Sequence, residues 1–226
     1  MNKSKNKSRI RKITKVLYEI YGDSNLGNKE EPLDELIFIV LTTKTSDKVF
    51  NSTFSTLLNK FGNWENIRTA SVEEIGESIK QGGLYKLKAK LIKGILQSIY
   101  EKNNSVLNLS FLRDMPDEEA EKYLLSLNGI GVKTAKCVLL YSLHRKVLPV
   151  DTHTYRLAYE IGLIPETYMR NEKGKLHAVL EELIPPDCKY QFHVGAVMHG
   201  RLEHTSKSSL GKCVLMGILA QRGLVD

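Results

Sequence analysis

Two glycines separated by a single residue constrain the fold of this chain more than any other short stretch. Gly129 and Gly131 lie between one apolar run that ends at Leu127 and a second that begins near Ala135. Glycine allows the backbone to turn back tightly where a side chain would clash. The stretch therefore predicts a helix, a hairpin and a second helix. At the start of that second helix, N–H groups without an intrahelical acceptor point outward with the positive end of the helix dipole, which favours a bound phosphate.

Apolar residues recur at helical spacing along the whole chain, and alternating strand patterns are absent. Start signals, such as the capping box of Ser71 and Glu74, and glycine stops bound the periodic runs. A helix that opens at Pro32, with Asp34 and Glu35 in its first turn, is apolar enough to be buried. Helices are predicted at about 13–20, 32–41, 45–61, 71–79, 84–99, 116–127, 133–143, 152–161, 172–183, 191–201 and 213–220. The fold class is therefore predicted to be all-α.

The charge of the chain favours a polyanionic partner. It has 33 Lys and Arg against 26 Asp and Glu, a net charge of +7 and a pI of about 9.2, and nucleic acid is the commonest polyanion. Seven basic residues precede the first acidic one, Glu19: Lys3, Lys5, Lys7, Arg9, Arg11, Lys12 and Lys15. Such a run is either a solvated, disordered tail or a flexible arm that raises non-specific DNA affinity.

A second group of lysines, on the helix predicted at 84–99, is expected to be plain solvated surface. Its members are Lys86, Lys88, Lys90 and Lys93.

No apolar run is long enough to cross a membrane, and no secretion signal is evident, so we expect an intracellular protein. The three cysteines, Cys137, Cys188 and Cys213, are widely spaced, which is typical of buried or incidental thiols rather than a metal cluster.

The hairpin stretch and the segment after it resemble a known signature. L-N-G-I-G-V-K-T-A at 127–135, followed by L-P-V-D-T-H at 148–153, is similar to the motif of the helix-hairpin-helix DNA glycosylases, most of all to the endonuclease III branch. Lys133 and Asp151 are 18 positions apart, the spacing of the catalytic lysine and aspartate of that branch. Similarity extends to G-L-Y at 83–85, Lys88-Ala89 and H-G-R at 199–201, and so covers the chain from about Pro32 onward.

The resemblance implies two helical lobes with the active site in the cleft between them. One lobe would be 33–146, which contains the helix-hairpin-helix motif, and the other would join 1–32 to 147–226. The implied partner is double-stranded DNA that contains a damaged base or an abasic site. The protein is expected to act as a monomer in the cytoplasm, associated with the nucleoid.

The chemistry of base excision assigns roles to Lys133 and Asp151. A base stacked in a duplex must be extruded before its sugar carbon can be attacked. A lysine amine attacks only when it is unprotonated, and the first turn of a helix favours the neutral amine of Lys133. At a helix N-cap, N–H donors favour an ionised Asp151, ready to stabilise positive charge on the sugar or to accept a proton. Alone, Lys133 would be interpreted as a lysine that only binds DNA, and Asp151 as an ordinary helix N-cap. Together, at this spacing and in this motif, they favour a catalytic role.

Further residues are predicted to contact DNA. The hairpin residues Gly129, Ile130, Gly131, Val132 and Thr134 would offer backbone N–H groups to phosphates, which positions DNA without reading its sequence. By resemblance, Leu84 matches the residue that wedges into the duplex. Lys44 stands where endonuclease III relatives usually carry glutamine, a second probe of the helix. His153 and His199 also match family positions, with either a structural or a functional role.

The resemblance implies a DNA glycosylase with AP lyase activity, with oxidised pyrimidines as the default substrate. Two alternatives stay open: a monofunctional glycosylase for alkylated purines or mismatched uracil or thymine, and a non-catalytic helix-hairpin-helix DNA-binding protein. Relatives hold a [4Fe–4S] cluster on four cysteines, the first shortly after H-G-R. Here His204 stands at that place and Cys213 is the only later cysteine. We therefore expect no iron–sulfur cluster and no other metal.

Overall fold

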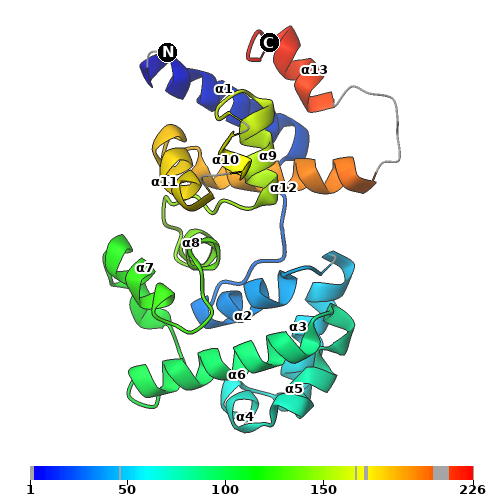
Figure 1. The fold of residues 1–226 in the computed structure, drawn as a ribbon, viewed down its shortest axis with the longest axis vertical. Helices are drawn as coiled ribbons and strands as arrows, with labels where there is room; N and C mark the ends of the chain where they lie inside the picture. Colours follow the sequence, from blue (N-terminus) through cyan, green and yellow to red (C-terminus); the bar gives the residue numbers. More distant parts are fainter. Residues whose placement is uncertain (1–2, 46, 166, 171–172, 206–213, 226) are drawn as a thin grey trace. The chain divides into compact units, whose positions relative to one another are not determined.

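The computed structural model describes residues 3–45, 47–165, 167–170, 173–205 and 214–225 and divides into two compact units. Over these residues the regular structure is entirely helical, as predicted. Unit 1 joins 1–26 to 146–226, and unit 2 is 27–145 (Figure 1). Unit 1 contains α1 (Lys3–Tyr21), α9 (Thr152–Glu160), α10 (Thr167–Arg170), α11 (Lys173–Leu183), α12 (Lys189–Thr205) and α13 (Val214–Gln221). Unit 2 contains α2 (Pro32–Thr42), α3 (Asp47–Phe61), α4 (Trp64–Thr69), α5 (Val72–Ser78), η1 (Lys80–Gly82), α6 (Tyr85–Lys102), η2 (Ser110–Arg113), α7 (Asp117–Leu125) and α8 (Val132–Tyr141).

Helix α2 is the centre of unit 2. It is apolar on every side, and α3, α6 and α8 pack against it (Figure 1). Phe38 makes edge-to-face contacts with Phe50 and Phe54 of α3, with ring centroids 5.2 and 5.7 Å apart. Such aromatic pairs stabilise a core beyond the area they bury. The apolar run after Pro32 is therefore buried, as the sequence predicted.

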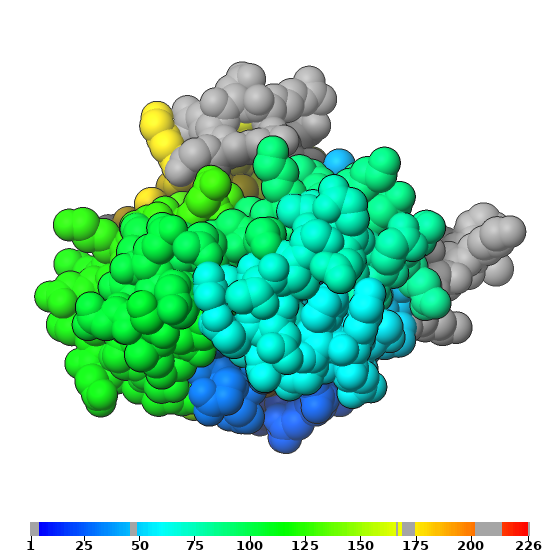
Figure 2. All heavy atoms as spheres, turned by 90° about the horizontal axis from the view of Figure 1, so that it is seen from below, coloured from blue at the N-terminus to red at the C-terminus, as the bar shows by residue number. Residues whose placement is uncertain are grey.

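The outer face of unit 2 is closed by α3, α4, α5 and the long helix α6. Seen from below, the cyan atoms of α3 to α5 adjoin the green atoms around α7 in one continuous face (Figure 2). Helix α4 was not predicted, because six residues are too few for a periodic pattern. Its start is set by Asn63, whose side chain accepts the N–H of Asn66 at 2.9 Å.

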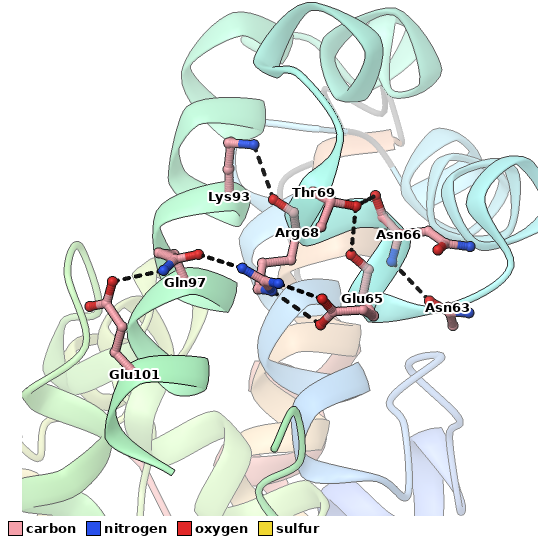
Figure 3. Close-up of polar contacts among 8 residues, drawn as sticks. All are labelled: Asn63, Glu65, Asn66, Arg68, Thr69, Lys93, Gln97 and Glu101. Carbon is pink, nitrogen blue, oxygen red and sulfur yellow. Dashed lines mark hydrogen bonds and ion pairs between the residues drawn. The ribbon is translucent and has the colours of Figure 1, made fainter. Parts of the chain in front are cut away.

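A polar network fastens α4 to α6 (Figure 3). The guanidinium of Arg68 donates to the Glu65 carboxylate and, at 2.9 Å, to Gln97 of α6. It also lies 3.9 Å from the ring centroid of Tyr100. Lys93 of α6 donates to the carbonyls of Arg68, in the last turn of α4, and of Ala70, the C-cap of that helix. The planar guanidinium stacks on an aromatic ring and donates hydrogen bonds to both helices, so it fixes their relative orientation.

The lysine face of α6 is therefore not plain solvated surface. Lys86 and Lys90 are exposed, as predicted, but Lys93 bonds α4 and Lys88 is buried with 3% of its surface exposed. The prediction failed for Lys88 and Lys93 because helical spacing identifies one face of a helix, whereas α6 is covered on more than one side by α2, α4 and α5.

The basic N-terminal segment is helical from Lys3 onward, so the predicted disordered tail or flexible arm is wrong. Its helix, α1, packs on α12 and α13 of unit 1. Ile10 and Ile13 are fully buried in the core of this unit. Arg11 forms a two-bond ion pair with Asp187, at 2.8 and 3.0 Å. Burial of the apolar stripe holds the basic residues in a regular helix.

The segment 27–32 belongs to unit 2, although the sequence placed it with the lobe of the termini. The described boundaries fall after residues 26 and 145 instead of after 32 and 146. Asn28 and the backbone N–H of Lys29 bond the Glu35 carboxylate, and the Lys29 ammonium lies 4.4 Å from the ring centroid of Phe38. These contacts attach the segment to α2 before the helix begins.

If the N-terminal segment is part of the core of unit 1, replacing Ile10 should destabilise the protein. Ile10→Ala removes a fully buried side chain and should lower the free energy of unfolding by about 2–5 kcal/mol. Lys12→Ala, two residues away on the exposed face, should change it by no more than about 0.5 kcal/mol. Urea-induced unfolding measures both. Equal stability of the two variants would mean that the segment does not pack.

Candidate active site

The hairpin between α7 and α8 uses its two glycines in different ways. Gly129 has a φ of +79°, and an added Cβ would lie 2.3 Å from Cδ1 of Leu91 in α6. Both the turn and the packing therefore require glycine there. Gly131 has an ordinary φ of −98°, and a Cβ there would have no protein atom within 4 Å. The fold thus requires Gly129, whereas Gly131 leaves open space at the start of α8.

The residues after the hairpin open helix α8. Ile130 is buried and its N–H donates to the Leu127 carbonyl at 3.2 Å, so it anchors the hairpin. Gly131 is the N-cap and has no side chain to accept the N–H groups of the first turn, where Val132, Lys133 and Thr134 lie. Val132 is exposed, and the other two are partly buried. The helix start is therefore suited to an external anion.

An ion pair holds the two helices of the motif together. Lys136 of α8 is 8% exposed, and its ammonium lies 3.3 Å from the Glu121 carboxylate of α7. Because both side chains are largely removed from solvent, this contact is screened less than a surface pair. It links α8 to α7 on the two sides of the hairpin.

A buried carboxyl group in α2 interacts electrostatically with Lys133. Glu35 is 0% exposed and accepts hydrogen bonds from Asn28 Nδ2 at 2.5 Å and from the Lys29 N–H at 2.7 Å. Burial raises the pKa of Glu35 to about 7, against the opposing effect of these bonds and of the Lys133 and Lys29 charges. The sequence indicated only an acidic residue in a first helical turn. Its burial could not be found without the packing of α2 on α8.

In unit 1, Asp151 is the N-cap of α9. Its Oδ1 accepts the N–H of Thr154 at 2.8 Å, as the sequence predicted. Thr154 is itself fully buried, and its hydroxyl shares a 2.8 Å hydrogen bond with Nδ1 of His193 in α12. The carboxylate is thus held on a helix start that is tied into the core. His193 was not singled out from the sequence, because a lone histidine carries no recognisable spacing.

The V-D-T-H and H-G-R segments meet inside unit 1. A Cβ at Gly200 would lie 2.0 Å from Nδ1 of His153, so glycine is required for the imidazole to fit. His199 precedes Gly200 in α12. Its Nδ1 lies 2.8 Å from the Tyr21 hydroxyl, and its Nε2 lies 3.6 Å from the Glu160 carboxylate. The structure therefore places both family-matched histidines in the packing of α1, α9 and α12.

The two predicted DNA probes lie in unit 2 and share an unusual backbone conformation. Lys44 and Leu84 are both exposed, and their φ angles are +51° and +48°. Leu84 is the N-cap of α6, so that helix begins one residue later than predicted. Non-glycine residues rarely adopt this left-handed conformation. Each side chain is consequently displayed at the tip of a short turn.

Among the described residues, no group of three or more histidine, cysteine or acidic side chains is arranged to hold a metal ion. Cys137 is buried in α8 of unit 2, and Cys188 is buried just before α12 of unit 1. Cys213 lies outside the described residues. The donor set does not fit the four-thiolate cluster of endonuclease III relatives. In the described part of the chain, no helix is long and apolar enough to span a membrane.

Solved structures with a similar fold include a complex of endonuclease III with DNA and a thymine-DNA glycosylase. A non-covalent complex of endonuclease III with DNA matches with a TM-score of 0.75 at 22% identity, over 96% of this chain and 94% of the other. A thermostable thymine-DNA glycosylase matches with a TM-score of 0.72 at 18% identity, over 92% and 94%. At these identities the likeness defines the class of fold.

Sequence comparison identifies the family. The model of the HhH-GPD superfamily of base excision DNA repair proteins matches residues 37–186. This chain belongs to that superfamily. The match contains the hairpin, Lys133 and Asp151, and so covers the motifs on which the predicted site depends.

Three curated relatives extend this result. At3g47830 of Arabidopsis thaliana, provisionally named a DNA glycosylase, is 31% identical over 83% of this chain. The DNA glycosylase/AP lyase ROS1 of the same plant is 32% identical over 68% of it. The chain spans 63% and 12% of these two proteins. MJ1434 of Methanocaldococcus jannaschii, provisionally named a DNA repair glycosylase, is 30% identical over 90% of this chain and 92% of its own length.

The buried Glu35 carboxyl should make stability depend on pH. Its folded-state pKa of about 7 lies above the ordinary 4.5, so the folded protein binds the extra proton and loses stability as pH rises from about 4.5 to 7. Above pH 7 the total loss in the free energy of unfolding from this group is at most about 3 kcal/mol. Glu35→Gln removes the titration, so the stability of the variant relative to the parent should rise between pH 5 and 8.

Urea unfolding at several pH values measures this difference. Glu73→Gln, at an exposed glutamate in the first turn of α5, is the matched control and should leave the pH profile unchanged. If the free energy of unfolding of Glu35→Gln changes with pH in the same way as that of the parent, Glu35 does not hold a proton in the folded state.

Proposed function

We propose that this protein is a DNA glycosylase with AP lyase activity, which excises a damaged base from duplex DNA and then cleaves the strand. The observation that carries the proposal is the family match over 37–186, which includes a lysine in the first turn after the hairpin and an aspartate at a helix N-cap. The relative ROS1 is named as a DNA glycosylase/AP lyase, which combines the same two activities. The opposing proposal of a non-catalytic DNA-binding protein has no need for this pair.

DNA binding is assigned to unit 2. The open start of α8 receives a backbone phosphate through the N–H groups after Gly131, a contact that positions the strand without reading its sequence. Leu84 and Lys44 enter the duplex where the nucleotide leaves it. Extruding the nucleotide costs a few kcal/mol, an amount that such wedge contacts offset.

The chemical steps are assigned to Lys133 and Asp151. The Lys133 amine bonds to C1′ of the sugar as the bond to the base breaks, and the base departs with that electron pair. The Asp151 carboxylate stabilises the positive charge on the sugar and accepts the proton that the amine loses. Ring opening gives a Schiff base. Removal of a proton from C2′ then expels the 3′ phosphate with the electrons of its C–O bond.

Oxidised pyrimidines are the proposed substrates, in line with the endonuclease III resemblance and with the fold match to that enzyme. The match to a thymine-DNA glycosylase supports mismatched thymine as the second candidate. A panel of duplexes, each with one lesion and tested with and without borohydride, separates the two. Cleavage identifies the substrate, and trapped adducts identify the lysine mechanism.

We also propose that the protein works as a monomer on nucleoid DNA without an iron–sulfur cluster. The chain has three cysteines, and two of them lie in different units. Four thiolates are the usual requirement for such a cluster. Stoichiometric iron and sulfide in anaerobically purified protein would refute this part of the proposal.

The first functional prediction concerns the covalent intermediate. Lys133→Gln should abolish borohydride trapping on a duplex with an abasic site, because an amide cannot form the Schiff base. Affinity for the same duplex should change by no more than a few fold. Persistent trapping by this variant would show that another amine is the nucleophile.

Asp151→Asn is the companion variant. Asparagine is as good an N-cap as aspartate, so the helix start and the stability should be kept. Loss of the carboxylate should lower the single-turnover excision rate by roughly 10²- to 10⁴-fold, the usual contribution of an acid–base group. An unchanged rate would remove Asp151 from the chemistry.

The two glycines provide a test of the phosphate site. Gly131→Val adds a side chain into open space, so it should cost only about 1 kcal/mol of stability, for the poorer N-cap, while affinity for an undamaged duplex falls by roughly 10-fold or more. Gly129→Val should instead destabilise the protein, because of its left-handed φ and the contact with Leu91. Fluorescence anisotropy at fixed salt and thermal unfolding distinguish the two effects. A Gly131→Val variant with parental affinity would place the phosphate elsewhere.

A further inference from the structure

Two turns of unit 2 that are 40 residues apart in sequence are fastened together. The first, 43–45, follows α2, and the second, 82–84, precedes α6. The Thr45 hydroxyl donates to the Gly82 carbonyl, so the turns contact each other directly. Each turn displays one exposed, left-handed residue, Lys44 or Leu84. Such a conformation is unfavourable for a residue with a side chain and persists only where surrounding contacts hold it.

The contact between the turns is completed by the ammonium group of Lys88. It donates to the Gly82 carbonyl at 2.8 Å, to the Thr45 hydroxyl at 2.5 Å and to the Leu41 carbonyl at 2.8 Å. The three donors of the ammonium group therefore meet three acceptors. The Leu41 carbonyl belongs to the last turn of α2, where a cation is favourable. One side chain thus joins the end of α2, the first turn and the second turn.

The position of Lys88 is unusual for a lysine. It is 3% exposed, although its helix also displays the exposed Lys86 and Lys90. Burial lowers the pKa of Lys88 to about 8, so the interior opposes its charge. Buried charges are retained where hydrogen bonds satisfy them and where they specify one arrangement. Here the arrangement is that of the two turns.

We infer that Lys88 is a positioning residue that holds Lys44 and Leu84 as one rigid two-pronged element for opening the duplex. The inference rests on the proposed function and deepens it. Lys88 acts on the two residues through the Thr45 hydroxyl, which is next to Lys44, and through the Gly82 carbonyl, two residues before Leu84. Because both prongs depend on the same three hydrogen bonds, they are expected to act together rather than as independent wedges.

The test compares Lys88→Met, which keeps an apolar side chain of similar length without donors, with Lys90→Met at an exposed lysine of the same helix. Extrusion is read from a 2-aminopurine placed beside an abasic-site analogue in a duplex. Lys88→Met should lower the extrusion signal or the duplex excision rate by roughly 10- to 100-fold, the usual effect of misplacing a positioning group by about 1 Å. Lys90→Met should match the parent.

A single-stranded oligonucleotide with an abasic site is the discriminating substrate, because it has no duplex to open. Lys88→Met should still be trapped on it by borohydride at the parental rate. Leu84→Ala should also reduce extrusion much less in the Lys88→Met background than in the parent. Equal losses on single and double strands would assign Lys88 a merely structural role and overturn the inference, as would parental extrusion by Lys88→Met.

Thr45→Val provides a second route, since it removes the hydroxyl that lies between the ammonium and the Gly82 carbonyl. It should show the same selective loss on duplexes, and it keeps the inference testable if Lys88→Met folds poorly. Failure of the parent itself to be trapped by borohydride on a duplex with an abasic site would refute the proposed function. Parental trapping combined with unimpaired extrusion by both variants would refute only the role of Lys88.

Discussion

The burial of the apolar residues of helix α2 is the constraint on which unit 2 depends. Its sides are apolar and covered by α3, α6 and α8, so its polar ends must be satisfied inside the protein. At the first turn, the Glu35 carboxyl receives hydrogen bonds from the segment before the helix. At the last turn, the Leu41 carbonyl accepts from Lys88. Each of these polar contacts lies beside a part of the predicted site.

One helix thus supports two parts of the proposed site. The first turn of α2 faces α8, whose Lys133 interacts with the Glu35 charge. The last turn leads into the turn that displays Lys44 and is joined to the one that displays Leu84. The hairpin is connected to the same framework, because Gly129 fits against Leu91 of α6. In unit 2, the proposed phosphate site, the proposed nucleophile and the proposed wedge therefore share one buried scaffold.

Unit 1 positions Asp151 by a different device. The aspartate caps α9, and the next turn of that helix is held in the core by the hydrogen bond of Thr154 to His193. The fit of His153 against Gly200 then joins α9 to α12. Both histidines that the family motif singled out have packing partners, whereas His193, which no motif marked, lies in the chain of contacts that begins at the carboxylate. A residue can thus match a motif because of the packing it serves.

The sequence by itself determined the helical class, the hairpin, the capping role of Asp151 and the spacing of Lys133 and Asp151. These features depend on short-range periodicity, glycine turns and N-cap chemistry, which neighbouring residues decide. Only the tertiary structure showed that Lys88 and Glu35 are buried, that α1 is an ordered helix, and that Gly131 is open while Gly129 is tightly packed. Charged residues on a helical pattern look alike in sequence. Their environments differ because segments distant along the chain cover one and leave the next in solvent.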